Sequence, residues 1–340
     1  MSDSLPVYIY SAAALGPHGD LSSGERAPIR GDAQNVDLSD LMDRFNTPEL
    51  RRASHFSQLS LISASEAIRR LDSPIDETAP LYFSTGLGEE LGTSALFEDV
   101  MQGRGESSSP FAFVNSVNNT TAFFLSKIAG LSGQSLIISQ EEFSFECALR
   151  SACGDISLGE SCHALVGGTD EVSLPRADHL TRIDLREDQP AGEGSGWLYL
   201  GKERAKAIGE IVILEEFTKV DCISSDMIGA IIKPCISKKE KVRLLPGFRL
   251  TPEEISALGH FYPQLDVMDY LKLCGCFHTA SAFGLASIFD KAEEEPVLYF
   301  HVNRNAYGRL FIVGIRVFDE RPEFFKAGRS SAHLLPSPDK

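Results

Sequence analysis

The chain has 340 residues and a formal net charge of −16 at pH 7, from 32 lysines and arginines against 48 aspartates and glutamates. Hydrophobic residues make up 43% and charged residues 24%, which is enough apolar sequence for a sizeable core and excludes a disordered chain. The acidic balance disfavours nucleic acid and anionic membranes as partners.

The ends and the cysteines indicate a protein of the cytoplasm. No apolar run approaches the roughly 18 residues of a membrane-spanning helix, and Asp3 stands where an export signal has a basic residue. Seven cysteines without a CxxC pair fit a reducing compartment better than a disulfide framework. Cys274 and Cys276 form a lone CxC, so burial is favoured over metal binding and no metal site is predicted.

Strand and helix patterns alternate along the chain, which predicts an α/β fold with parallel strand pairs. A strand over 6–12 precedes a Gly-rich loop, and helical sequence runs from 38 to 71. The sequence then predicts strands at 81–83, 135–139, 163–167, 228–234 and 242–245, helices at 93–102, 120–130, 143–158, 252–260 and 278–290, and a loop at 103–119. We expect one hairpin from 196–202 and 209–217 and a second from 296–302 and 309–317.

Two Gly-rich segments resemble phosphate-binding loops only in part. Gly86, Gly88 and Gly92 follow a strand, but their spacing is GxGxxxG, and no acidic residue about 20 positions on ends a recognisable strand. The segment 192–196 precedes a strand, so it cannot place a phosphate on a helix N-terminus, and we expect a tight turn there. No cofactor is therefore predicted.

The segment 136–170 has the pattern strand, short turn, helix and second strand. Such a turn is a usual place for a nucleophile, because a helix N-terminus stabilises negative charge by up to about 1–2 kcal/mol. Two carboxylates, Glu141 and Glu142, occupy it here. These residues alone leave a second interpretation open, in which both simply fill the favourable first turn of a helix.

The segment also resembles the β-ketoacyl synthases of fatty-acid and polyketide synthesis, which have the thiolase-like fold, and the resemblance extends over nearly the whole chain. The matching stretches are 7–19, 109–133, 144–168 and GEGSGWLYLGKERAKAIGE at 192–210. The resemblance implies two pseudo-duplicated α/β halves in an α-β-α-β-α arrangement of layers. We place the halves at 1–217 and 218–320 and a flexible tail at 321–340.

Ser144, Ala148, Gly159, Gly167 and Gly168 match the family pattern without a gap. The resemblance then puts Glu142 at the position of the catalytic cysteine. A carboxylate cannot replace that thiolate, because it would have to form a mixed anhydride, far uphill from a thioester. Cys147 lies more than a helical turn further on, so burial is favoured over catalysis for it.

The family's two active-site histidines are only half retained. Gly247 stands at the first position, in Gly247-Phe248-Arg249-Leu250-Thr251, where the family has HGTGT. His278 matches the second, although Phe277 replaces a glycine before it. The closing glycine-rich loop of the family corresponds to 303–308, where the paired glycines are missing. A fold kept while its catalytic groups are lost is typical of a scaffold for binding.

These losses resemble the chain-length factors, non-catalytic subunits that pair with an active ketosynthase and shape the pocket of the growing chain. The resemblance implies a pseudoenzyme in a heterodimer, which acts on acyl carrier protein through the complex. The short chain is also compatible with aryl polyene synthesis. It further implies two sets of residues in contact with the partner. The set before the active site is Phe111, Ala112, Phe113 and Ser116, and the set on the edge strand is Leu136, Ile137 and Ile138.

Two other functions stay open at this stage. One is a malonyl-carrier-protein decarboxylase, as in relatives with glutamine at the nucleophile position; an ionised Glu142 fits it poorly, because it would repel the malonate carboxylate. The other is an independent acyl- or carrier-protein-binding module. Release of carbon dioxide tests the first, and co-purification with a ketosynthase tests the second.

Overall fold

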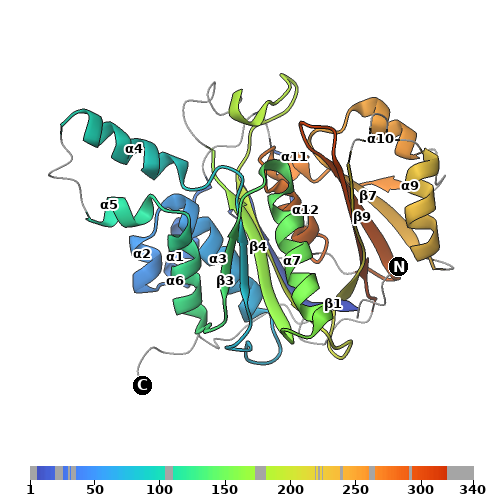
Figure 1. The fold of residues 1–340 in the computed structure, drawn as a ribbon, viewed down its shortest axis with the longest axis horizontal. Coiled ribbons are helices and arrows are strands. Elements are labelled where there is room, and N and C mark those ends of the chain that lie inside the picture. The colour runs from blue at the N-terminus through green and yellow to red at the C-terminus, as the bar shows by residue number, and fades with distance from the viewer. Residues whose placement is uncertain are drawn as a thin grey trace.

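The computed structural model describes most of the chain and resolves one mixed sheet with helices on both of its faces (Figure 1). The described residues are 6–19, 26–29, 31, 36–103, 110–172, 181–218, 220, 223, 225–237, 240–259, 265–290 and 293–319. The tail predicted at 321–340 lies outside them, as does the loop 104–109.

Ten strands of the described residues pair in the order β3-β2-β4-β5-β1-β6-β10-β9-β7-β8. Their bounds are β1 Val7–Leu15, β2 Leu81–Ser84, β3 Ser135–Ile138, β4 His163–Asp170, β5 Gly194–Gly201, β6 Gly209–Phe217, β7 Lys241–Pro246, β8 Asp266–Val267, β9 Val297–Arg304 and β10 Leu310–Val317. The predicted parallel pairing is confirmed for β2 with β3 and β4 and for β7 with β8 and β9.

The strand order repeats itself after five strands. Strands β1 to β5 are ordered β3-β2-β4-β5-β1, and strands β6 to β10 are ordered β8-β7-β9-β10-β6. The direction of pairing repeats as well, because β4–β5 and β1–β5 are antiparallel, as are β9–β10 and β6–β10. The predicted duplication is therefore visible in the topology. The two sets meet only where Val7, Tyr8 and Ile9 of β1 pair with β6.

Helices complete five layers, α-β-α-β-α, as expected (Figure 1). Helices α3 and α6 share a core with the outer face of the first strand set, α7 and α12 lie between the two sets, and α9 and α10 cover the outer face of the second. The helix bounds are α1 Ser39–Arg44, α2 Pro48–Arg52, α3 His55–Arg69, α4 Glu90–Met101, α5 Pro110–Asn115, α6 Asn119–Ala129, α7 Ser144–Leu158, α9 Ser225–Ile232, α10 Pro252–Gly259, α11 Leu271–Cys274 and α12 Ala280–Ser287, with 3-10 turns η2 Glu141–Phe143 and η3 Lys233–Cys235.

Several predicted elements are wrong in detail. The expected hairpin of 196–202 and 209–217 does not form, because β1 lies between β5 and β6 and pairs with both. A buried strand such as β1 needs hydrogen-bond partners along both edges, and the two consecutive strands β5 and β6 supply them from either side. The expected strand at 228–234 is mostly the helix α9, whose fully buried Ile228 and Ile232 are four residues apart on one face.

Two further segments differ from the predicted secondary structure, and the second predicted hairpin is confirmed. The helical sequence at 38–71 is three helices, α1 to α3, and the expected loop at 103–119 contains α5. The second predicted hairpin is confirmed as β9 and β10. Within the described part of the chain, none of the helices has the length and apolar character that crossing a bilayer requires.

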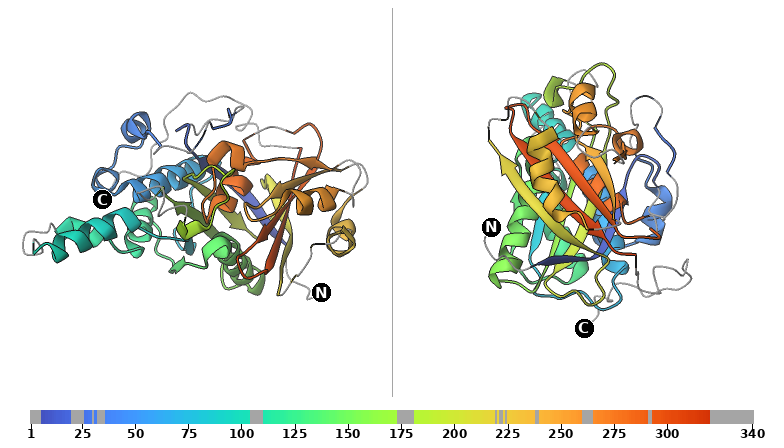
Figure 2. Two further views of the ribbon diagram at one scale, coloured as in Figure 1. Left: turned by 90° about the horizontal axis from the view of Figure 1, so that it is seen from above. Right: turned by 90° about the vertical axis from the view of Figure 1, so that its right-hand side faces the viewer.

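The division of the chain at 217 stays a prediction. Because the repeat of strand order begins with β6, we propose to place the division earlier, between β5 and β6. Figure 2 shows that α4 and α5 extend away from the layered body as an arm, which is also visible in Figure 1.

Close packing of β5 on α12 depends on a glycine. A Cβ built on Gly196 would lie 2.1 Å from the carbonyl oxygen of Ala282. We expect Gly196→Ala to lower the free energy of unfolding by about 1–3 kcal/mol, because backbone must shift to admit the methyl group. The matched control is Gly154→Ala in α7, where the added carbon meets nothing within 4 Å and the helix gains about 0.5–1 kcal/mol. Urea unfolding measures both; equal stability of the two variants would contradict this account.

Candidate functional site

The two halves bring their middle-layer helices to a common centre. Glu142 lies two residues before the first residue of α7, and His278 lies two residues before the first residue of α12. The duplication therefore gives these two predicted positions equivalent places in the two halves. Gly247 directly follows β7. Contacts through its neighbours Phe248 and Arg249 join all three positions in one site.

The carboxylate of Glu142 is held in a buried ion pair. Its exposed fraction is 1%, and its Oε1 accepts a hydrogen bond from Nε of Arg249. The guanidinium continues to Asp184 Oδ2 at 2.9 Å and to the carbonyl oxygen of Ile183 at 3.2 Å. The second oxygen of Glu142 has no hydrogen-bond partner among the described residues. The residue predicted to stand at the nucleophile position thus takes part in a buried ion pair.

A strained turn fixes where Glu142 points. Glu141 has φ 49°, in the left-handed region that residues other than glycine rarely adopt. Ser144 stabilises the turn, because its Oγ accepts from the amide of Gln140 at 2.8 Å and donates to the carbonyl oxygen of Glu141 at 2.7 Å. Strain of this kind is typical of functional turns, and here it directs a carboxylate into the core.

Asn303 on β9 fills the space beside Gly247, the predicted position of the first histidine. Its Nδ2 donates to the carbonyl oxygen of Glu142 at 2.8 Å and to Oε1 of Glu146 at 2.7 Å. A Cβ built on Gly247 would lie 2.3 Å from Oδ1 of Asn303. A side chain at 247 therefore has no room unless Asn303 moves.

Sequence reasoning missed a second buried pair behind Glu142. Glu146 and His301 are both fully buried, and Oε1 of Glu146 lies 3.1 Å from Nε2 of His301. The other ring nitrogen, Nδ1, is 2.9 Å from the carbonyl oxygen of Leu245. A carbonyl oxygen only accepts, so Nδ1 is the donor in that contact, and the contact with Glu146 needs a further proton, either on Nε2 or on the carboxyl group. One signal in the sequence could have revealed Glu146. It is a charged residue between the apolar residues Phe145 and Leu149, on the face of α7 that is buried.

His278 is packed by an aromatic ring and a glycine. Its imidazole stacks on Phe248 with 6.5 Å between ring centroids and an interplanar angle of 3°. A Cβ on Gly86 would overlap the imidazole, and Nδ1 of His278 has no hydrogen-bond partner among the described residues. The absence of a side chain at Gly86 therefore makes room for the imidazole of His278. This packing explains the glycine without a nucleotide-binding loop.

Asp170, at the end of β4, organises the backbone around His278. Its carboxylate accepts from the amides of Gly86 at 2.9 Å and Leu87 at 3.1 Å and from Oγ1 of Thr85 at 2.7 Å. On the other side it accepts from both the amide and the hydroxyl of Thr279, at 2.9 and 2.8 Å. Asp170 thereby ties the loop after β2 to the start of α12. Sequence reasoning missed this residue as well.

Burial disfavours the thiolate form of three of the described cysteines. Burial raises the pKa of the Cys147 thiol, so the thiolate is disfavoured there. Burial also raises the pKa of Cys276 to about 12 and that of Cys274 well above its usual value. Within the described ranges, His, Cys, Asp and Glu side chains form no group of three that could hold a metal ion.

The residues expected to meet a partner lie on another face. Strand β3 is at the edge of the sheet, with Leu136 exposed and Ile137 and Ile138 half-buried. Phe113 on α5 is 65% exposed, while Ala112 and Ser116 are half-buried. Phe111 lies on α5 as well, but its side chain is outside the described atoms.

Comparison with known proteins agrees with this fold. Residues 19–180 match the family model described as "Beta-ketoacyl synthase, N-terminal domain". The solved complex AntDE:AntF, a type II polyketide synthase acyl carrier protein with its ketosynthase bound to the hexaketide, contains a chain that gives a TM-score of 0.72 at 14% identity, over 93% of this chain and 100% of that one. No curated relative matches the chain by sequence.

Two further solved structures give the same result. The ishigamide ketosynthase/chain length factor has a TM-score of 0.68 and a β-ketoacyl synthase from Burkholderia phymatum one of 0.66, each at 14% identity over 92% of this chain and 99% of the other. The chain thus has the thiolase-like fold of the ketosynthases. The predicted resemblance to the β-ketoacyl synthases is confirmed.

The ion pair at the centre predicts a large effect on stability. We expect Arg249→Met to lower the free energy of unfolding by about 3–5 kcal/mol, because it leaves the Glu142 carboxylate buried without a partner. The double variant Arg249→Met with Glu142→Gln should recover much of this loss. As a control, Lys241→Met removes a cation from the exposed pair with Glu295, at a cost of about 0–1 kcal/mol. Urea unfolding would refute the account if Arg249→Met behaved like Lys241→Met.

Proposed function

We propose that this protein is a non-catalytic, chain-length-factor-like subunit that pairs with an active β-ketoacyl-[acyl carrier protein] synthase and shapes the chain that the pair elongates. The observation that carries the proposal is the buried Glu142–Arg249 pair, at the position that we predict for the nucleophile. Condensation by this family needs a thiolate that accepts an acyl group from a thioester. A carboxylate engaged by a guanidinium is neither a comparable nucleophile nor exposed to a substrate.

The same pair argues against a decarboxylase. Such an enzyme has to bind the carboxylate of malonate near this position, and in relatives a neutral glutamine stands there. The guanidinium of Arg249 contacts two carboxylates, those of Glu142 and Asp184. The negative charges here therefore already outnumber the positive one. A malonate carboxylate at about 4–6 Å would be repelled.

An apolar surface supports pairing with another subunit. Strand β3 has one edge without a strand neighbour in the described sheet, and such an edge favours pairing with another chain. Exposed large apolar side chains occur on this strand, on α4, α5 and α6, and between the last two helices. They are Phe97, Val100, Met101, Phe113, Val114, Val117, Phe123 and Leu136. Exposed apolar residues gathered on neighbouring elements favour an interaction site.

The comparisons support the class of partner but not the product. One similar structure is named as a ketosynthase with its chain length factor, and another as an acyl carrier protein with its ketosynthase. We carry over the ketosynthase as direct partner and the acyl carrier protein as partner of the complex. A role in aryl polyene synthesis and a cytoplasmic location stay predictions.

The protein alone should not become acylated. After incubation with acyl-CoA or acyl carrier protein, intact-protein mass spectrometry should show no adduct, because Glu142 replaces the thiol and Gly247 the first histidine. The variant Glu142→Cys should regain little turnover, since residues that act as a unit are strongly non-additive. A stoichiometric acyl adduct on the unmodified chain, on Cys147 or elsewhere, would overturn the proposal.

The edge strand should carry the pairing. Co-expression with a ketosynthase encoded beside it should give a stable heterodimer on size-exclusion chromatography. Ile137→Lys should split the pair or make the protein insoluble, because an unpaired charge buried in an interface costs several kcal/mol. Leu158→Lys is the control, since Leu158 is exposed at the far end of α7. A stable monomer that ignores every neighbouring ketosynthase would contradict the proposal.

Side-chain volume on and just after α5 should set product length. In the reconstituted complex, Ala112→Trp or Ser116→Phe should shorten the product without abolishing the first condensation, and Phe113→Ala should lengthen it or broaden its distribution. A misfit of about 1–3 kcal/mol in a packed pocket biases termination roughly tenfold per step. Product mass spectrometry decides; unchanged lengths in all three variants with the dimer intact would reduce the subunit to a stabilising role.

A further inference from the structure

Four acidic side chains, which we call the acidic cluster, lie buried where β4 ends and the arm begins. They are Glu89 before α4, Asp170 at the end of β4, Glu171 directly after it and Glu193 before β5, with exposed fractions of 4%, 1%, 3% and 0%. Asp170 pairs with Gly194 in the strand register, which brings Glu171 beside Glu193. The amide of Val172 agrees with this, because it donates to Oε2 of Glu193 at 3.0 Å. Only Asp170 of the cluster has a role in the site described above.

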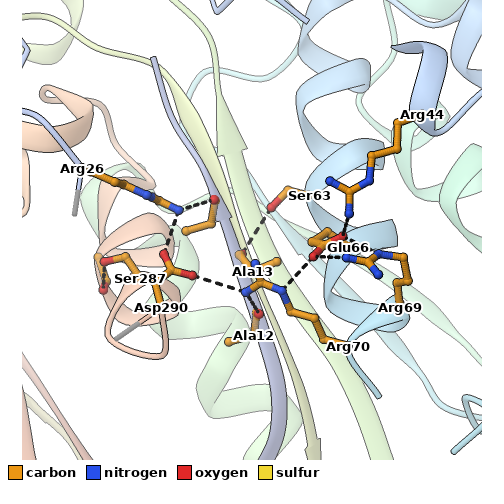
Figure 3. A network of polar contacts seen from close by, with 12 residues as sticks. Ala12, Ala13, Arg26, Arg44, Ser63, Glu66, Arg69, Arg70, Ser287 and Asp290 are labelled. Carbon is orange, nitrogen blue, oxygen red and sulfur yellow. Dashed lines mark hydrogen bonds and ion pairs between the residues drawn. The ribbon is translucent and has the colours of Figure 1, made fainter. Parts of the chain in front are cut away.

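Other buried carboxylates of this protein are matched with arginines (Figure 3). Arg70 alone contacts two of them, Glu66 at 2.9 Å and Asp290 at 3.3 Å. Among the described residues, by contrast, no lysine or arginine forms an ion pair with a member of the acidic cluster. The basic partner that the structure shows there is His55, whose Nε2 lies 2.7 Å from Oε1 of Glu193. The cluster therefore has more acidic groups than its surroundings neutralise.

Glu171 is the group that holds a proton in this cluster. Carboxyl groups buried side by side do not all ionise, because their negative charges repel one another. Oε1 of Glu171 has no hydrogen-bond partner among the described residues. Burial, and then the charges of Glu89 and Glu193, raise the pKa of Glu171 to about 8. Burial acts on Glu66 in the same direction, yet its arginine partners hold the pKa of Glu66 below its usual value.

The first turn of α4 is attached to the acidic cluster. The amide of Leu91 donates to the carboxyl group of Glu171, and the amide of Gly92 donates to Oε2 of Glu89 at 3.0 Å. No residue of α4 is buried. Elements with few buried contacts are the ones that open most easily. The state of the cluster therefore has a direct effect on how firmly the arm is held.

The charged groups around Glu171 come from the elements packed against it. They are Asp170 on β4, Glu89 before α4, Glu193 before β5 and His55 at the start of α3. In the first turn of α4, Arg182 pairs with Glu90, so that cation is already matched. A charge on His55 at acid pH would favour the closed arm as protonation of Glu171 does, so a test has to separate these two groups.

We propose that the start of α4 is a pH-sensitive switch, which holds the arm closed while Glu171 is protonated and loosens it when Glu171 ionises. In the open arm Glu171 contacts water and is separated from Glu89, so its pKa returns toward the usual value of 4.5. The closed arm thus binds one proton more than the open arm between about pH 4.5 and 8, and closure weakens as the pH rises through this window. The switch belongs to the isolated chain and does not depend on the proposed pairing.

Pulsed hydrogen exchange of the full chain at about pH 6 and about pH 9 tests the proposal. Protection factors are compared, because they remove the faster intrinsic exchange at alkaline pH. We expect protection of α4 to fall at least about tenfold at the higher pH, and Glu171→Gln to remove this fall, since glutamine still accepts from Leu91 but does not ionise. The matched control is Glu98→Gln, because Glu98 is exposed on the same helix. It should keep the fall.

A second variant keeps the test decisive if Glu171→Gln does not fold. Glu89→Gln retains an acceptor for Gly92 and removes one repelling charge from Glu171, so the loss of protection should be smaller and should end at a lower pH. The proposal is overturned if α4 of the unmodified chain is equally protected at both pH values. It is equally overturned if Glu171→Gln keeps the full loss, as when His55 is the titrating group, or if Glu89→Gln behaves like the unmodified chain.

Discussion

Each half of this molecule holds the start of the other half's central helix. Asp170, at the end of β4 in the first half, accepts two hydrogen bonds from Thr279, just before α12 of the second half. Asn303, near the end of β9 in the second half, donates to the carbonyl oxygen of Glu142, just before α7 of the first. Strands β4 and β9 are equivalent in the repeat. These reciprocal bonds, more than the narrow join of β1 and β6, bring both helix N-termini to one centre.

A second constraint acts at that centre. A carboxylate that points into the core is tolerated only with a compensating cation. Arg249 supplies the charge, Asn303 holds the backbone, and Glu146 with His301 forms a further buried pair behind them. The reciprocal bonds hold the backbone of the centre. The charged pairs fill the space between the two helix N-termini and satisfy the charges there, which is the arrangement on which the proposed non-catalytic role rests.

The sequence was sufficient for the fold, and its match without a gap at 144–168 drew attention to Glu142. Gly247 and His278 were singled out from looser matches, and the structure joins all three positions through Phe248 and Arg249. It did not reveal the partners of those positions. Arg249 lies in a segment that was read only for its missing histidine, and Glu146 and His301 are 155 positions apart with no spacing signal between them. The strand expected at 228–234 failed for a local reason, since a run of isoleucines has high strand propensity and yet places Ile228 and Ile232 on one helical face.

The paired charges also restrict how this chain can change over generations. Replacing Glu142 by cysteine alone removes the buried partner of Arg249, and adding a side chain at Gly247 alone collides with Asn303. Removing Arg249 alone leaves the Glu142 carboxylate buried without its cation. Each single replacement at these positions therefore passes through a less stable protein, and only several simultaneous replacements avoid the loss. The coupled contacts act as a ratchet against stepwise change at this centre and leave the outer surfaces freer to change.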